Sequence, residues 1–361
     1  MKRLAGSLIA IAVSLWIGTH PALGSEARVG VVASVVPIAF VAEELGGDRV
    51  KVDVLVPPGA SPHTFEPVPS DMVKLQRARL FLRVGAGLDG WSDKLRAAGS
   101  REMETVTLIA APGMKLLEGG HDHHDHGHGK EPAEKHDDHD HGHEEKRAEK
   151  HDDHGHEEKR AEKHDDHGHG EEKHAEKHDD HAGERGEGMD PHFWLDPIRV
   201  RDAVVPAIME HLIEADPAGK EYYEKRGKDF HKRLTALDIQ IRRELAKAKG
   251  REFVAFHRAW PYFSERYNVE EVGVVQEFAG EEPTPRELAA LVRAARAAGI
   301  GSILVEPQLN PRVAQTIASE FGGGTVMVDP VGDPGEPARS TYEKLMLFNA
   351  RAFVQALGGQ N

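Results

Sequence analysis

A repeated tract that is rich in histidine and acidic residues interrupts this chain and limits what can fold. Between Ala133 and His181, segments of the type AEKHDDHGHEEKR follow one another. The four repeats start at Ala133, Ala148, Ala161 and Ala175. Because the tract has almost no apolar side chain beyond alanine, burial cannot offset the entropy that ordering would cost. We therefore expect a disordered insertion over 120–188, with a folded protein on either side.

The tract also carries most of the net charge. Between His121 and His181 there are 10 Lys and Arg residues against 22 Asp and Glu residues, a net charge of −12, whereas the whole chain carries −15. The remainder, at −3, is close to neutral. Nucleic-acid binding requires a basic surface, which this balance does not provide, so we expect no nucleic-acid partner.

The N-terminus has the pattern of an export signal. Lys2 and Arg3 precede the apolar run LAGSLIAIAVSLWIG, which is shorter than the roughly 20 residues of a membrane span. Small residues then stand at Ala22 and Gly24, as before a cleavage site. We predict a signal peptide over 1–24 and an exported, soluble protein, with an uncleaved anchor as the alternative. The chain has no cysteine, so we expect neither a disulfide nor a lipid anchor on cysteine.

Eight short apolar runs predict two α/β lobes. They are rich in Val, Ile and Leu, as buried parallel strands are, and helical patterns separate several of them. Four runs precede the tract and four follow it, which suggests one sheet on each side. The runs begin near Arg28, Lys51, Ala78, Glu104, Glu252, Val272, Ser302 and Thr325.

A long amphipathic helix is predicted between the lobes. The segment 218–249 contains no proline, and its apolar residues recur at steps of three or four, which is typical of a helix packed against a core. The stripe consists of Phe230, Leu234, Leu237, Ile241 and Leu245. We expect an N-terminal lobe over 25–200, a helical region with the linker helix over 201–249, and a C-terminal lobe over 250–361.

Four polar residues outside the tract are candidates for a binding site. His63 lies in the loop PPGASPHTFEPVPSD after a predicted strand, and His192 lies in MDPHFWLDP just past the tract. His257 directly follows the predicted strand EFVAF, and Asp329 directly follows TVMV. Ligands of open parallel sheets bind beyond the carboxyl ends of the strands, so a cleft between the lobes could gather all four. Three imidazoles and a carboxylate suit tetrahedral Zn(II), although spacing alone also allows purely structural roles.

The other histidines outside the tract are not candidates. His20 lies in the predicted signal peptide, and His211 and His231 lie in helical stretches away from strand ends. We expect structural roles for the last two.

The segments around the candidate residues resemble a known family. PPGASPHTFEPVPSD, MDPHFWLDP, FVAFHRAWPYFSERY, PTPRELAALV, VEPQLNP and VDPVG look like successive signature segments of the periplasmic zinc-binding subunits of ABC importers. These are the ZnuA-like members of the zinc and manganese solute-binding family. The match runs from about Arg28 to the C-terminus and is interrupted only by the tract. It implies two (β/α)4-type lobes with parallel sheets, joined by a long rigid backbone helix, with the metal in the cleft between them.

The resemblance also assigns ligands. It implies that His63, His192 and His257 bind the metal and that Asp329 supplies a carboxylate at the fourth position. Manganese-type relatives tend to have a carboxylate where this chain has His257, which favours zinc. Some zinc members have an acidic residue immediately before the first ligand, where this chain has Pro62. The fourth position is therefore left to Asp329 or to water.

The implied function is capture and delivery without covalent chemistry. We expect a periplasmic monomer that binds Zn(II) as the transported ligand and passes it to the membrane permease of an ABC importer, whose ATPase is a separate protein. The chain has no GxxxxGK[ST] motif and no HExxH motif, so neither an ATPase nor a hydrolytic zinc enzyme is favoured. The alternatives are a subunit for manganese or another divalent metal, and a periplasmic zinc buffer that acts through the tract.

The tract itself predicts auxiliary weak metal sites. Its HDDH and HGH units place imidazoles and carboxylates within a few residues of one another, so a flexible chain can form transient sites with two or three donors. The donors would be His121, His123, His124, His126, His128, His136, His139, His141, His143, His151, His154, His156, His164, His167, His169, His174, His178 and His181.

Overall fold

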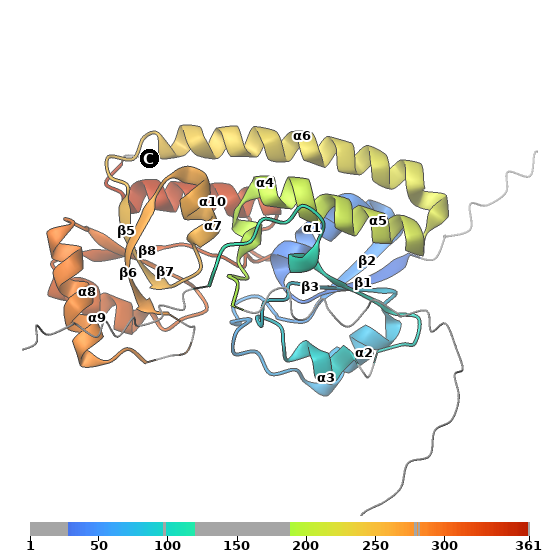
Figure 1. Cartoon of the computed structure of the whole chain (residues 1–361), viewed down its shortest axis with the longest axis horizontal. Helices are drawn as coiled ribbons and strands as arrows, with labels where there is room; N and C mark the ends of the chain where they lie inside the picture. The colour runs from blue at the N-terminus through green and yellow to red at the C-terminus, as the bar shows by residue number, and fades with distance from the viewer. Residues whose placement is uncertain (1–27, 97–98, 120–187, 278–279, 281, 360–361) are drawn as a thin grey trace, which may run out of the picture. The chain divides into compact units, whose positions relative to one another are not determined.

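The structure is a computed structural model, and its described residues form β-sheets with helices packed around them (Figure 1). Within the described part of the chain, no helix combines the length and the apolar character needed to cross a membrane. The predicted signal peptide and the predicted insertion, except residue 188, lie outside the described residues. The described residues are 28–96, 99–119, 188–277, 280 and 282–359.

The eight predicted strands form two four-stranded parallel sheets, which confirms the expected α/β fold with two lobes. The first sheet has the order β2-β1-β3-β4, and the second has the order β6-β5-β7-β8. In the first sheet the strands are β1 (Val29–Ala33), β2 (Val50–Val54), β3 (Leu80–Arg83) and β4 (Glu104–Thr107). In the second they are β5 (Glu252–His257), β6 (Glu270–Gln276), β7 (Ser302–Val305) and β8 (Gly324–Met327).

The two sheets share one topology with a functional consequence. In each sheet the chain moves outward from the first strand to one side and then continues on the other side. The strand order therefore reverses between β1 and β3, and again between β5 and β7. In open parallel sheets the crevice beyond the carboxyl ends of the strands at such a reversal is the usual ligand site.

Helices cover the sheets and begin at recognisable signals. Thr284 and Glu287 form a reciprocal capping box at the start of α8, and the Asn310 side chain accepts from a backbone N–H at the start of α9. The helices of the first lobe are α1 (Val36–Gly46), α2 (Pro69–Arg77) and α3 (Ser92–Arg96), with the 3₁₀ turns η1 (Gly47–Arg49) and η2 (Leu108–Ala110). Those of the second are α7 (Pro261–Tyr267), α8 (Pro285–Ala297), α9 (Pro311–Glu320) and α10 (Tyr342–Ala356).

A run of helices connects the two sheets. It consists of η4 (Phe193–Leu195), α4 (Pro197–Arg199), the π-helical turn η5 (Val200–Val204), α5 (Val205–Ala215), η6 (Pro217–Gly219) and α6 (Lys220–Leu245). The prediction of a long amphipathic helix is confirmed by α6, because all five residues of its apolar stripe are buried.

Helix α6 packs against both lobes. It contacts α1 of the first lobe and α10 of the second, as its course in Figure 1 also shows. Arg233 of α6 forms ion pairs with Glu44 of α1 and with Glu343 of α10. One continuous hydrophobic cluster includes residues as distant as Val31 of β1 and Phe253 of β5. The two sheets are thus held by a common core, which fixes where their carboxyl ends lie.

Candidate metal centre

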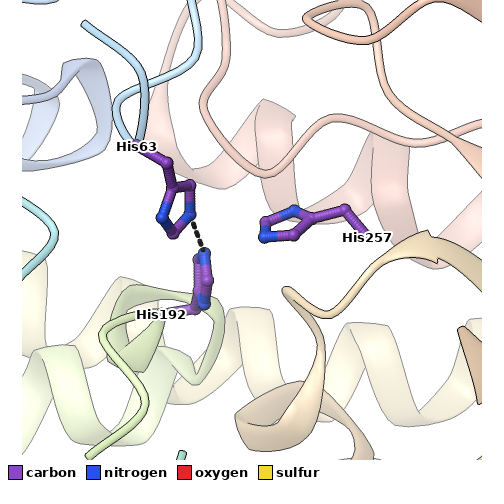
Figure 2. A group of neighbouring side chains, drawn as sticks. All are labelled: His63, His192 and His257. Carbon is purple, nitrogen blue, oxygen red and sulfur yellow. Dashed lines mark hydrogen bonds between the residues drawn. The ribbon is translucent and has the colours of Figure 1, made fainter. Parts of the chain in front are cut away.

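Three of the four predicted site residues come together. His63 lies in the loop between β2 and α2, His192 lies directly before η4, and His257 is the last residue of β5 rather than the first residue after it. Each offers a ring nitrogen that lies within 4.8 Å of the other two (Figure 2). The ring centroids are 4.9 to 5.3 Å apart. Segments separated by the tract and by α6 therefore meet at one point.

The closest ring nitrogens are spaced as two ligands of one ion would be. The Nε2 atoms of His63 and His192 are 3.2 Å apart. Two nitrogens that each bind a tetrahedral zinc ion at roughly 2.0 to 2.1 Å lie about 3.3 Å from one another. The pair thus has the separation that a tetrahedral ion requires, and His257 points toward the same place (Figure 2).

Two carboxylates orient the rings, and both were missed in the sequence. The Nδ1 atom of His192 lies 3.1 Å from Oδ1 of Asp190, and Nδ1 of His257 lies 3.3 Å from both carboxylate oxygens of Glu306. A ring that donates its Nδ1 proton to a carboxylate presents an unprotonated Nε2 to a metal. Asp190 could have been found from its place two residues before His192. Glu306 ends the predicted run SILVE just as Asp329 ends the predicted run TVMVD, so the criterion that selected Asp329 also applies to Glu306.

The position of Glu306 follows from the sheet order. Strands β5 and β7 are neighbours, and His257 ends β5 while Glu306 follows the last residue of β7. The two side chains therefore lie beside the point where the strand order of the second sheet reverses. Both are buried, with 3% and 6% of their surfaces exposed, so little water competes for the contact between them.

Burial and charge act differently on two of the imidazoles. Burial and the neighbouring His192 and His257 rings lower the pKa of His63 to about 2, so this ring is neutral at any physiological pH. Burial also opposes a charge on His257, but the Glu306 carboxylate outweighs it and raises the pKa of His257 above its ordinary value. A metal that binds here therefore competes with a proton at His257 but not at His63.

Hydrogen bonds from aromatic side chains hold the loops around the cluster. The indole N–H of Trp194 donates to the carbonyl of Pro330 at 2.7 Å, and the Tyr262 hydroxyl donates to the carbonyl of Asp190 at 2.9 Å. On the side of the first lobe, the Trp91 indole N–H donates to the carbonyl of Pro62 at 3.1 Å. Each donor is a rigid ring, so the loops that carry His63 and His192 are fixed with little side-chain entropy to lose.

A small cavity lies among the three rings. The three histidines, Glu306 and Gln308 line it together with nearby loop residues, and it offers about 10 Å³ to a water-sized occupant. A single water requires a volume of about this size. The cavity is suited to an ion or a water molecule and not to an organic substrate.

The structure does not bring Asp329 to the three histidines. Its carboxylate is 1% exposed and accepts hydrogen bonds from Nε2 of Gln308 at 2.9 Å and from the backbone N–H groups of Val331 at 3.0 Å and Gly332 at 2.9 Å. Its other oxygen lies 2.6 Å from the guanidinium of Arg339. These four partners occupy the carboxylate. Asp329 therefore holds the loop after β8 and the side chain of Gln308.

A second group of metal-ligating side chains lies at the surface. Glu104, His211 and Glu214 also have ligand atoms within 4.8 Å of one another. The Nδ1 atom of His211 lies 2.8 Å from Glu104 and 3.3 Å from Glu214, and both carboxylates are exposed. The sequence predicts a structural role for His211. The tract histidines lie outside the described residues.

Comparison with known proteins places the chain among metal-uptake proteins. A family model described as "Zinc-uptake complex component A periplasmic" matches residues 31–356. The chain is 27% identical over 305 residues to the high-affinity zinc uptake system protein ZnuA of Bacillus subtilis, covering 84% of this chain and 78% of that protein. It is 25% identical over 367 residues to the manganese-binding lipoprotein MntA of Halalkalibacterium halodurans, covering 99% of both chains.

A solved structure shares the fold. The crystal structure of a ZnuA deletion mutant with zinc bound aligns with a TM-score of 0.66 at 24% identity, over 92% of this chain and all of that one. The relatives include zinc proteins and a manganese protein, so similarity alone does not decide between the two metals.

Proposed function

The chain belongs to the family of periplasmic zinc-uptake complex components, and from that premise we propose that it captures Zn(II) and delivers it to the membrane permease of an ABC importer. The observation that carries this proposal is the convergence of three imidazoles, two of them buried and one half-buried, from three separate segments. Nothing else in the described residues supplies three nitrogen donors at one point. The ion is the cargo, and it leaves the protein unchanged.

The donor set favours zinc over manganese. Imidazole nitrogens suit zinc, whereas manganese prefers carboxylate, carbonyl and water oxygens. His257 is the residue at which manganese-type relatives tend to have a carboxylate. Its Nδ1 atom faces Glu306, so the Nε2 atom, and not an oxygen, is directed at the ion.

Binding proceeds through the neutral forms of the rings. His192 and His257 present Nε2 because their Nδ1 atoms face carboxylates, and the low pKa of His63 keeps that ring uncharged. As the ion enters, the proton shared by the His257 and Glu306 pair stays on Nδ1, and any second proton on the ring is released. The three segments that carry the rings are already in place, so little order has to be created on binding.

We retain three further elements as part of the proposal. Residues 1–24 export the chain, 120–188 form a tract that collects zinc weakly through its histidines, and the lobes divide at 200 and 249. The tract raises the local zinc concentration near the tight site through its many donors and its negative charge. A second candidate function, a periplasmic zinc buffer, assigns the main role to the tract instead.

Calorimetric titration of a protein that lacks 120–182 tests this function. We expect one tight zinc site per chain and much weaker manganese binding. Replacing His257 by Glu supplies an oxygen donor and should lower the ratio of zinc affinity to manganese affinity by at least about tenfold. Tighter manganese than zinc binding in the parent would overturn the assignment of zinc. Absence of any tight site, with zinc binding only in the full chain, would favour the buffer.

A further inference from the structure

The side chain of Gln308 presents an unexplained polar atom at the metal centre. Gln308 lies two residues after Glu306 and lines the same cavity as the three histidines. Its Oε1 atom is buried and has no hydrogen-bond partner within the described part of the chain. A buried acceptor without a donor is unfavourable and usually marks a place where a water or ligand binds.

Asp329 determines which end of the Gln308 amide faces the cavity. Its carboxylate lies 2.9 Å from Nε2 of Gln308 and is acceptor-only, because it also receives two backbone N–H groups and the Arg339 guanidinium. The amide must therefore turn its NH₂ group toward Asp329. Oε1 is consequently the atom left to face another partner. None of the ring nitrogens of His63, His192 and His257 donates to Oε1.

We infer that Gln308 is a positioning residue for the fourth zinc ligand: its carbonyl oxygen accepts a hydrogen bond from a water that completes the tetrahedron. The inference rests on the proposed function and adds the identity of the fourth ligand to it. A zinc-bound water is a strong donor because the ion withdraws charge from it, so it supplies the donor that Oε1 lacks. Asp329 then acts on the metal only through Gln308.

The role of water as the fourth ligand also suits a transported ion. A water can leave or be replaced without any protein loop being moved, whereas each histidine is fixed by its own segment. Release of zinc then begins at the one position that the protein does not itself occupy. Gln308 sets how firmly that position is held.

The crystal structure of the zinc-loaded protein gives the direct test. We expect three Nε2 ligands and one water that lies within about 2.6–3.2 Å of Oε1 of Gln308. Direct binding of the ion by Gln308, Glu306 or Asp329, or a water that makes no contact with Gln308, would overturn the inference. The proposed function would survive each of these outcomes, since three histidines would still hold the ion.

A variant tests the same contact in solution. Gln308→Met keeps the length of the side chain and removes the acceptor, and Gln355→Met, at an exposed position on α10, is the matched control. We expect zinc affinity to fall about tenfold in the first variant and to stay unchanged in the second. In the cobalt(II)-loaded protein, the bound water should ionise at lower pH in Gln308→Met. The carbonyl oxygen of Gln308 stabilises bound water relative to hydroxide, and the variant lacks this oxygen.

The cobalt pH profile separates positioning from a merely structural role. A general loss of packing would weaken binding without moving the ionisation of the bound water. Equal affinity and an equal pH profile in Gln308→Met and the parent would refute the role of Gln308 alone. Failure of the parent to bind zinc or cobalt(II) tightly would instead refute the proposed function, and the inference with it.

Discussion

Two groups of side chains in the described residues meet the same distance criterion for a metal site, yet they differ in almost everything else. One consists of His63, His192 and His257, and the other of Glu104, His211 and Glu214. In the first, His192 and His257 are 3% exposed, and the Nδ1 atom of each of these two rings faces a carboxylate. In the second, both carboxylates lie in solvent and flank one nitrogen of a single imidazole.

The difference shows which properties turn a group of neighbouring ligand atoms into a metal-binding site. At the surface group, His211 already has two anions beside the nitrogen that would bind, and an ion pair explains the arrangement. Exposed ion pairs contribute little to folding stability, and salt screens the attraction between their charges. At the three-histidine group, carboxylates orient His192 and His257, both rings are largely shielded from solvent, and His63 is neutral before any metal arrives. The cost of assembling the site has been met by folding.

The largest expected effect is the loss of zinc affinity when a histidine of the first group is replaced, compared with replacement of the histidine of the second group. In a protein that lacks 120–182, His257→Ala removes one of the three nitrogen ligands and should weaken zinc binding by more than about 100-fold. This loss exceeds the one expected when a residue that only hydrogen-bonds to a ligand is removed. His211→Ala should change it by less than about twofold. Competition titration against a zinc-sensitive dye measures both. Equal losses in the two variants would show that the surface group takes part in the tight site.

The pH dependence distinguishes the groups next. Glu306 raises the pKa of His257, so this ring gains a proton as the pH falls through that raised value, and zinc must then displace it. Each further pH unit costs about tenfold in affinity for one displaced proton, so we expect a loss approaching 100-fold between pH 7 and pH 5. His63, with a pKa of about 2, contributes nothing in this range. Affinity that is constant from pH 7 to pH 5 would exclude His257 as a ligand.

Changing the carboxylates sharpens the contrast. Glu306→Gln removes the charge that orients His257 and should weaken zinc binding at pH 7 by about tenfold. It should also move the acid loss of affinity to lower pH, because the raised pKa of His257 is no longer supported. Glu214→Gln, beside His211, is the matched control and should do neither. A weaker affinity with an unshifted pH profile would mean that Glu306 acts through packing and not through its charge.

Most of the fold was predictable, and the reason is local. Buried parallel strands are continuous apolar runs, so all eight could be recognised without their neighbours. The stripe of α6 from Phe230 to Leu245 likewise needs only its own spacing. The convergence of the three histidines was expected from strand ends and from the family resemblance. Their role as ligands stays a proposal.

The supporting residues were harder to predict, because their roles depend on which strands are neighbours. Glu306 meets His257 only because β7 lies beside β5, and periodicity does not reveal strand order. Asp329 follows a strand just as Glu306 does. Its carboxylate, however, accepts hydrogen bonds from Arg339 and from two backbone N–H groups, and all three donors lie within the next ten residues of the chain. Two carboxylates with the same sequence signal thus have different partners, and the structure is needed to tell them apart.

The smallest expected effect at the tight site comes from deleting the tract. Its transient sites must be ordered at the moment of binding, so each should be weaker than a site that folding has already assembled. Removing 120–182 should therefore change the affinity of the tight site by less than about twofold while abolishing the additional weaker binding seen on titration with excess zinc. In cells, uptake should suffer only when zinc is scarce or chelated, since an antenna matters only when arrival limits capture. Loss of the tight site on deletion would make the tract part of the primary centre. If the number of zinc ions bound per chain did not change on deletion, the 18 tract histidines would bind no zinc. The proposed difference between preassembled donors and donors that must be ordered on binding would then be refuted for the tract.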